Sequence, residues 1–142
     1  MSIELQTANA MIAAASDKAR SLGAQVSVAV VDAGGNLVAF GRMDGAEIAG
    51  PTLAVDKAYT SVSNRISTQE LSVLAAPGGP LFGLHANGAG RFVIFGGGIP
   101  VEDESGAVVG AIGVSGGAVE EDVAAATAGV VEWGKRRPVQ RD

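Results

Sequence analysis

Apolar positions in the first third of the chain change from helical to strand spacing. They recur every three or four residues over Leu5–Leu22, and Gly23 follows, which predicts an amphipathic helix that ends at this glycine. Valines alternate with serine and alanine over Val26–Asp32. Residues 33–36, Ala-Gly-Gly-Asn, tolerate a positive φ, so together with Leu37–Arg42 this segment predicts a β-hairpin.

Two helices and a long loop are predicted next. Pro51 suits the first turn of a helix to about Asn64, because the N–H that proline lacks has no partner there. Residues 67–70, Ser-Thr-Gln-Glu, form a capping-box pattern for a short helix that ends near Ala75. Residues 76–90 hold seven glycines or prolines, which predicts a long loop.

Strand patterns return in the last third and a helix pattern ends the chain. We expect strands at Arg91–Phe95, Val101–Glu104 and Ala107–Ser115, a tight bend at Gly96–Pro100, a turn at 104–106, and a final helix with Val119, Val123, Ala126, Val130 and Trp133 on one stripe before Pro138. The predicted order is one helix, two strands, two helices, three strands and one helix.

This order predicts one α+β domain over residues 1–142. Strands joined by tight turns are antiparallel neighbours, so we expect a five-stranded antiparallel sheet. The N- and C-terminal helices would cover one face of this sheet, and the two central helices form a helical insertion after the first hairpin.

Composition narrows the classes of function. The chain has no cysteine, which excludes disulfides and thiolate metal sites. Fifteen acidic residues against ten basic ones give a net charge of −5, which disfavours a nucleic-acid partner. The first ten residues lack the basic and apolar regions of a signal peptide, which predicts a cytoplasmic protein. The sequence has no run of about 20 apolar residues, so we expect no membrane span.

The second predicted helix carries chemistry on one turn. Lys57 and Thr60 are i, i+3 neighbours, and Asp56 shares a face with Thr60. A lysine supplies a cation for a carboxylate, and a threonine hydroxyl can donate or accept a hydrogen bond. An ordinary solvent-exposed helix face explains the same residues, and both interpretations stay open.

Three further places are candidates for a site. The glycine run 96–98, followed by Pro100, would let a flat ligand approach the backbone, although a strained turn explains it equally well. His85, the only histidine, lies in the predicted loop, where an imidazole can act as a general base or an axial metal ligand, or simply be solvated. Nothing completes a protein-only transition-metal site around it, so we expect no such metal. Arg42 closes the hairpin and is a candidate for the rim of a ligand site.

Four segments in order resemble the GlcG/HbpS family, which includes the C-terminal domain of PduO-type proteins. They are VSVAVVDAGGN at 26–36, DKAYT at 56–60, GGGIPV at 96–101 and GAIGVSG at 110–116. The resemblance covers nearly the whole chain. It implies a profilin-like fold with a five-stranded sheet, and homo-oligomers such as dimers that assemble into octamers.

The resemblance also implies a ligand, since several members of the family bind haem. In this family the threonine of the Lys-Ala-x-Thr segment is associated with the haem site, and here it is Thr60, preceded by Lys57. The bend with Gly97, Gly98 and Pro100 would lie near the same pocket. Lys57 or Arg42 would then bind a propionate.

The sequence therefore supports a small-molecule-binding protein, with haem or another tetrapyrrole as the expected ligand. The alternative is a cytoplasmic catabolic enzyme that acts on a small organic acid, in which Lys57 anchors a carboxylate and Thr60, His85 or Asp56 moves a proton. A non-catalytic oligomeric scaffold is a third hypothesis. No complete acid–base set follows from the residues, so catalysis stays open.

Overall fold

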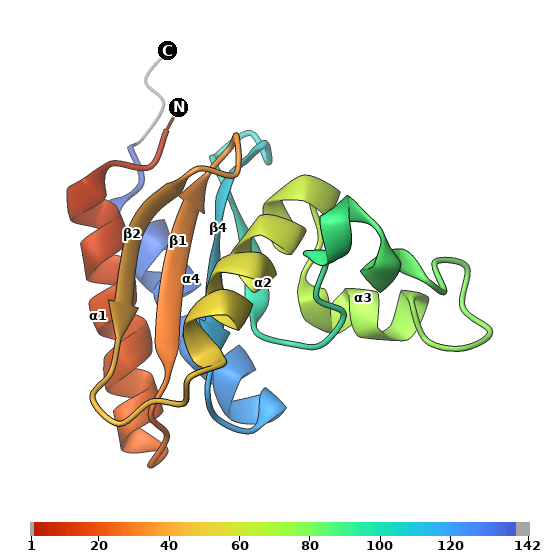
Figure 1. The fold of residues 1–142 in the computed structure, drawn as a ribbon. Helices are drawn as coiled ribbons and strands as arrows, with labels where there is room; N and C mark the ends of the chain where they lie inside the picture. Colours follow the sequence, from red (N-terminus) through yellow and green to blue (C-terminus); the bar gives the residue numbers. More distant parts are fainter. Residues whose placement is uncertain (1, 139–142) are drawn as a thin grey trace.

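The structure, a computed structural model, describes residues 2–138, which form an α+β fold of three layers (Figure 1). One sheet has strand order β2-β1-β4-β3, and every neighbouring pair is antiparallel. Its strands are β1 (Ser27–Asp32), β2 (Leu37–Arg42), β3 (Gly98–Glu102) and β4 (Val108–Ser115).

The hairpin β1–β2 predicted from the sequence is confirmed. Its turn is held by the carboxylate of Asp32, which accepts hydrogen bonds from the backbone N–H groups of Gly34 and Asn36.

The expected five-stranded, profilin-like sheet is wrong, because within residues 2–138 the sheet has four strands. The segment Arg91–Phe95 is not a strand. The N–H of Val93 donates instead to the side-chain hydroxyl of Thr60, at 2.9 Å, so a helix side chain replaces a ladder partner. The bend expected at Gly96–Pro100 is shorter than predicted, because β3 already begins at Gly98.

Pro100 therefore lies in a strand and not in a bend. It pairs with Ala111 of β4. Since β3 is at the edge of the sheet, a proline without an N–H leaves no ladder bond broken on its outer side.

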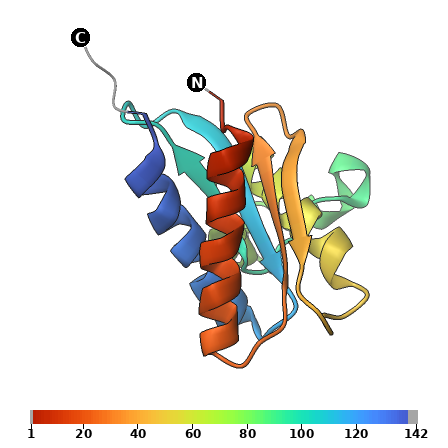
Figure 2. The same cartoon turned by 90° about the vertical axis from the view of Figure 1, so that its left-hand side faces the viewer.

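Helices cover both faces of the sheet, not one. Figure 2 shows α1 (Leu5–Ser21) and α4 (Val119–Arg136) side by side on one face. On the other face lies α2 (Gly50–Asn64), followed by α3 (Thr68–Leu74). The hydroxyl of Ser67 accepts a hydrogen bond from the N–H of Glu70, so the cap predicted for α3 is confirmed.

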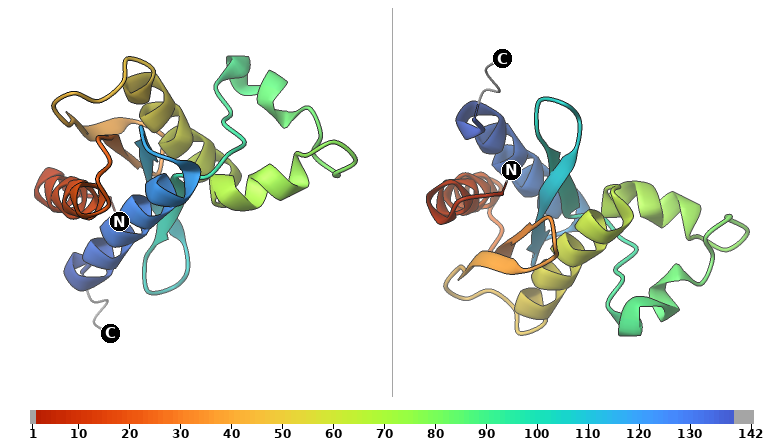
Figure 3. Two further views of the ribbon diagram at one scale, coloured as in Figure 1. Left: turned by 90° about the horizontal axis from the view of Figure 1, so that it is seen from below. Right: turned by 90° about the horizontal axis from the view of Figure 1, so that it is seen from above.

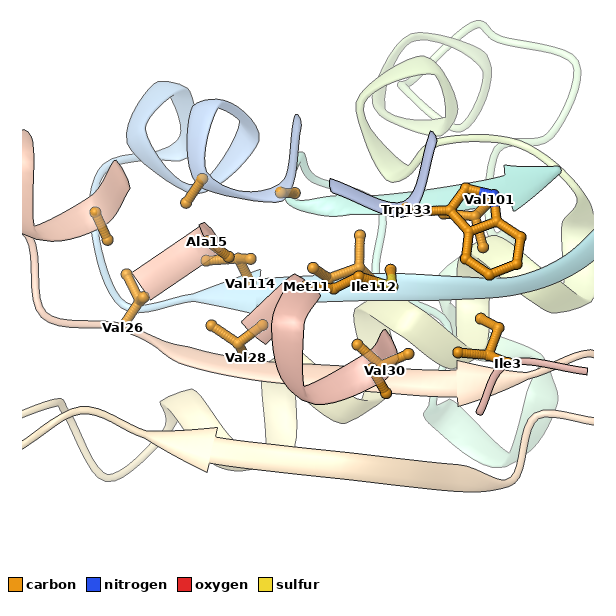
Figure 4. Packing of buried hydrophobic residues seen from close by; sticks show 14 of the residues in the cluster. Ile3, Met11, Ala15, Val26, Val28, Val30, Val101, Ile112, Val114 and Trp133 are labelled. Atoms are coloured by element: carbon orange, nitrogen blue, oxygen red, sulfur yellow. The ribbon is translucent and has the colours of Figure 1, made fainter. Parts of the chain in front are cut away.

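The main core lies between the sheet and the pair α1 and α4 (Figure 4). Val26, Val28 and Val30 point into it together with Met11 and Trp133. The alternate residue Val31 packs in a second cluster against Ala58 and Val62 of α2. Because β1 is buried on both faces, its sequence is a nearly unbroken run of apolar and small residues.

Residues 65–95 form an arm that stands away from the sheet beside α2 (Figure 1). The arm contains α3 and two short 3₁₀ turns, η1 (Leu84–Ala86) and η2 (Gly88–Gly90). Figure 3 shows that its outer loop turns back, so that residues 84–95 return towards α2. The long loop predicted at 76–90 thus carries these two turns.

The backbone of α2 packs directly on β4 at Gly113. A Cβ atom at this position would lie 2.1 Å from the carbonyl oxygen of Ala54 and 2.6 Å from the amide nitrogen of Ala58. No side chain fits in that space, so Gly113 sets how closely the helix approaches the sheet.

We expect Gly113→Ala to lower the free energy of unfolding by about 1–3 kcal/mol, because α2 must move away from β4 to admit the methyl group. Urea unfolding measures the change. Gly134→Ala in α4 is the matched control, since no heavy atom lies within 4 Å of its Cβ position, and it should be neutral or stabilising by up to about 1 kcal/mol. Equal stability of the two variants would contradict the close packing of α2 on β4.

Candidate functional site

Lys57 of α2 is buried, with 1% of its surface exposed. Its Nζ atom donates a hydrogen bond to the carbonyl oxygen of Val114, at 2.9 Å, and forms an ion pair with Asp122 Oδ2, at 3.2 Å. The same nitrogen lies 5.0 Å from the centre of the Phe95 ring. The lysine therefore joins α2 to the end of β4 and to the first turn of α4.

Asp122 is the partner that makes this burial possible. Its Oδ1 atom accepts a hydrogen bond from the N–H of Gly117, at 2.9 Å, while Oδ2 faces Lys57. Burial lowers the pKa of Lys57 and raises the pKa of Asp122, and in each group the attraction of the other opposes the shift.

Sequence reasoning missed this pair. The two residues are 65 positions apart, and the acidic start of α4 is sufficiently explained by the helix dipole. A signal was present in α2, because Lys57 falls on the stripe of small residues that packs on the sheet. That stripe consists of Gly50, Ala54, Ala58 and Ser61.

The glycine run lies in direct contact with Lys57, whereas the sequence interpretation placed both at the wall of a ligand pocket. A Cβ atom on Gly97 would lie 2.8 Å from Lys57 Nζ, and one on Gly98 would lie 2.4 Å from the Lys57 carbonyl oxygen. Gly97 also has a φ of +132°, which side chains rarely adopt. The hydroxyl of Ser61 is buried here without a hydrogen-bond partner in the described part of the chain. Backbone and side chains thus fill the corner between α2 and the glycine run.

Thr60 is also buried and its hydroxyl is fully engaged. It donates to the carbonyl oxygen of Asp56, at 2.6 Å, and accepts from the N–H of Val93, at 2.9 Å. These two bonds hold the end of the arm against α2, so they leave the hydroxyl little capacity for a ligand.

The other predicted site residues are spread over the molecule. Arg42 is exposed, donates to the carbonyl oxygen of Ala46, and lines a cavity of about 510 Å³ with Arg20 and Asp44. His85 is exposed on η1 in the arm. Pro100 is half-buried in β3. The structure therefore brings together Lys57, Gly97 and Gly98 and separates them from Arg42, whose cavity none of the three lines.

A second cluster, which the sequence did not reveal, lies between the arm and α2. Arg91 Nε forms an ion pair with Asp56 Oδ1, at 3.0 Å, and its guanidinium carbon lies 3.7 Å from the centre of the Tyr59 ring. The ring of Phe92 stacks on Tyr59 with a centroid distance of 6.1 Å. Arg91 and Phe92 were expected in a strand, where they would have faced opposite sides of a sheet.

Residues 2–138 lack two features that would point to other classes of function. No helix in this range is both long and apolar enough to cross a membrane. The same residues contain no group of three or more histidine or acidic side chains placed to hold a metal ion.

Comparisons with known proteins agree on one family. A family model described as haem degrading protein HbpS-like matches residues 3–131. An uncharacterised 15.0 kDa protein from the dhaT–dhaS intergenic region of Citrobacter freundii is 42% identical over 120 residues, covering 84% of each chain. Protein GlcG of Escherichia coli is 35% identical over 110 residues, covering 78% of each chain. A crystal structure of a PduOC–haem complex matches with a TM-score of 0.88 at 33% identity, covering 93% of this chain and 95% of that one. The resemblance stated from the four sequence segments is confirmed.

We expect Lys57→Met to lower the free energy of unfolding by about 3–5 kcal/mol, because Asp122 is left buried without its cation. Combining Lys57→Met with Asp122→Leu removes both charges and should restore most of this loss. Urea unfolding of the single and double variants measures the difference. A double variant as unstable as the single one would mean that the ion pair itself is not what Lys57 contributes.

The pH dependence of the pair has a defined sign. In the alkaline window below the ordinary lysine pKa the unfolded chain binds more protons, so the unfolding free energy rises with pH. In the acid window above the ordinary carboxyl pKa the folded chain binds more protons, so the unfolding free energy falls as pH rises. The wild-type chain should therefore be least stable, relative to the double variant, between these two windows.

We expect Thr60→Val to cost about 1–3 kcal/mol, because the buried N–H of Val93 loses its acceptor. Thr60→Ser keeps the hydroxyl and is the control. Hydrogen exchange should show lost protection at Val93 in the valine variant and near wild-type protection in the serine variant. Unchanged protection of Val93 in the valine variant would show that the hydroxyl does not hold this segment.

Proposed function

The chain belongs to the HbpS-like family, whose model is described as haem degrading protein, and we propose that it binds haem or another tetrapyrrole. The observation that carries the proposal is the likeness to the PduOC–haem complex over 93% of this chain. At 33% identity and a TM-score of 0.88, the two chains share more than a general arrangement of elements. The proposal concerns binding, and no step of haem breakdown is assigned.

A tetrapyrrole makes specific demands on the residues that bind it. A haem is a flat apolar ring with two carboxylates, so a site offers aromatic or aliphatic contact, a cation and a ligand for the iron. Lys57 and Thr60 have the right chemistry, but their polar atoms bind Asp122, Val114, Asp56 and Val93 instead. The corner at Gly97 and Gly98 does not fit a tetrapyrrole as it stands, and we assign its residues a structural part.

The arm and α2 contain most of the residue types that such a ligand uses. The chain has six aromatic side chains, and four of them belong to this region. These four are Tyr59, Phe82, Phe92 and Phe95. The cation Arg91 and the only histidine, His85, come from the same region. This composition supports a tetrapyrrole more than it supports a small polar acid, which would gain little from aromatic contact.

The catabolic enzyme acting on an organic acid gains no support from the geometry. Its carboxylate would have to displace Asp122 from a buried lysine that also binds Val114. We therefore do not propose it. A homo-oligomer, such as a dimer or octamer, and a cytoplasmic location stay predictions from the sequence and its resemblance.

We expect hemin added to the purified protein to give a saturable change in the Soret band with a fixed stoichiometry. Absorbance titration followed by gel filtration measures it, because bound haem elutes with the protein. The Lys57→Met and Asp122→Leu double variant is the control for the buried corner, and it should bind hemin like the wild type. A Soret band that stays that of free hemin at every ratio would remove the proposed function.

A further inference from the structure

We propose that Asn87 in the arm is a site of spontaneous covalent modification, at which the backbone nitrogen of Gly88 attacks the asparagine side chain and leaves isoaspartate and aspartate in its place. The chain has four asparagines, and Asn87 is the only one that a glycine follows. The inference goes beyond the proposed function, because the reaction needs only the chain and water. It gives the arm a slow change of charge and shape.

The reaction has two steps that balance without an oxidant or an enzyme. First the nitrogen of Gly88 forms a bond to Cγ of Asn87, and the bond between Cγ and the amide nitrogen breaks. The amide leaves as ammonia, which takes up the proton that the attacking nitrogen loses, and a five-membered imide ring remains. Water then opens this ring at one of its two carbonyl carbons. Attack at Cγ gives aspartate, and attack at the backbone carbonyl carbon gives isoaspartate, in which the chain continues through the former side chain.

The attacking nitrogen lies outside the hydrogen-bonded turns of the arm. Asn87 and Gly88 are both exposed and lie at the junction of η1 and η2. The N–H groups that close these two turns belong to Ala86, Asn87, Gly90 and Arg91. The N–H of Gly88 thus belongs to neither turn, and a glycine has no Cβ atom to obstruct the ring.

The side chain of Asn87 is weakly held and its backbone is irregular. Its Nδ2 atom donates to the carbonyl oxygen of Gly83 at 3.4 Å, which is long for such a bond. Asn87 itself is extended, with φ −97° and ψ 178°. The next three residues all have a positive φ, including Ala89 at +57°, a conformation that side chains rarely adopt. Local motion of this exposed segment can therefore form the ring while the sheet stays folded.

The other three asparagines lie in settings that oppose the reaction, and each is followed by a residue with a side chain. Asn36 donates from Nδ2 to both carboxylate oxygens of Asp32, at 3.2 and 3.3 Å. Asn64 donates to the carbonyl oxygen of Thr60, at 2.9 Å, at the end of α2. Asn9 lies inside α1, where helical hydrogen bonds fix the backbone. The structure therefore selects Asn87 among side chains of the same chemistry.

Asp44 is the competing place, because it is also exposed and also precedes a glycine. An aspartate forms the same ring by losing water, but a carboxylate, the usual form at neutral pH, is attacked by nitrogen less readily than an amide. Gly45 also packs on Gln25, since a Cβ atom there would lie 3.0 Å from the Gln25 Oε1 atom. We therefore expect Asp44 to react more slowly than Asn87.

The products change both the charge and the shape of the arm. Residues 71–90 contain no aspartate, glutamate, lysine or arginine, so the new carboxylate would be the first acidic group in this stretch. Isoaspartate also adds a carbon atom to the backbone at the residue whose carbonyl oxygen accepts the N–H of Gly90, at 3.1 Å. This bond is part of η2, so the longer backbone should loosen that turn.

Peptide mapping by mass spectrometry tests the site. Wild-type protein is incubated at mildly alkaline pH, and samples taken over time are digested. We expect Asn87 to gain the mass of an amide-to-acid conversion at least about tenfold faster than each other asparagine. The modified peptide should elute as two isomers, of which the isoaspartate form accepts a methyl group from an isoaspartyl methyltransferase added as a reagent. The rate should rise with pH, because the attacking nitrogen must lose its proton.

Two variants at the same position are the controls. Asn87→Gln keeps an exposed amide but would need a larger ring, so it should show no isoaspartate at this position over the same time. Circular dichroism and urea unfolding should give wild-type stability, because position 87 is exposed. Freshly prepared Asn87→Asp carries the new charge on a normal backbone. Its Gly90 amide signal in NMR spectra should stay near the wild-type position, whereas aged wild-type protein should shift or lose this signal.

The outcomes separate the site from its effect. An Asn87 that stays unmodified would overturn the proposal outright. Equal conversion of another asparagine, or earlier isoaspartate at Asp44, would show that the structure does not select this place. If isoaspartate forms and the Gly90 signal stays unchanged, the predicted loosening of η2 is wrong. None of these measurements uses hemin, so their result is independent of the proposed function.

Discussion

The close approach of α2 to the sheet is the constraint on which the rest of the structure depends. Gly113 of β4 and Gly98 of β3 lie against the helix backbone, with no room for a Cβ atom at either position. Only at this short distance can Lys57 extend past the end of β4 and meet Asp122 of α4. A buried ion pair thereby joins α2 on one face of the sheet to α4 on the other face. Such a pair specifies how the two layers are placed more than it adds stability.

Side chains of α2 and α3 hold the chain where it returns from the arm to the sheet. The segment that returns from the arm forms no strand, although within residues 2–138 β3 is an edge strand of the sheet. Thr60 of α2 accepts the N–H of Val93 in this segment, and Thr68 of α3 accepts the N–H of Gly98 at the start of β3. In the segment 91–95, which the sequence predicted as a strand, a threonine hydroxyl thus replaces the backbone partner of Val93.

Local patterns were sufficient for much of the fold. The spacing of apolar residues in α1 and α4, the Asp32 turn and the Ser67 cap all act within a few residues, so the sequence predicts them well. Arg91–Phe95 failed because its apolar residues suit a strand equally well, and its real partner is a hydroxyl 33 residues earlier. The Lys57–Asp122 ion pair and the Arg91–Tyr59 contact also join residues that are far apart in the sequence. Residue types alone therefore could not reveal them. The sequence predicts that Lys57 and the glycine run face one pocket, and the structure has them packed against each other instead.

The corner at Lys57 is filled, so a chain of a ligand-binding family can bind its ligand only at another place. Every small residue that lets α2 sit close to β4 removes volume from the space in which a flat ring would have to fit. A tetrapyrrole is too large to enter such packing without separating α2 from the sheet, which would break the Lys57–Asp122 pair and the Thr60–Val93 bond together. At the arm, the exposed side chains belong to residues that make few contacts with the core, so the chain can change there at little cost to the packing. The rigidity of the centre is thus the physical reason to look for binding at the periphery.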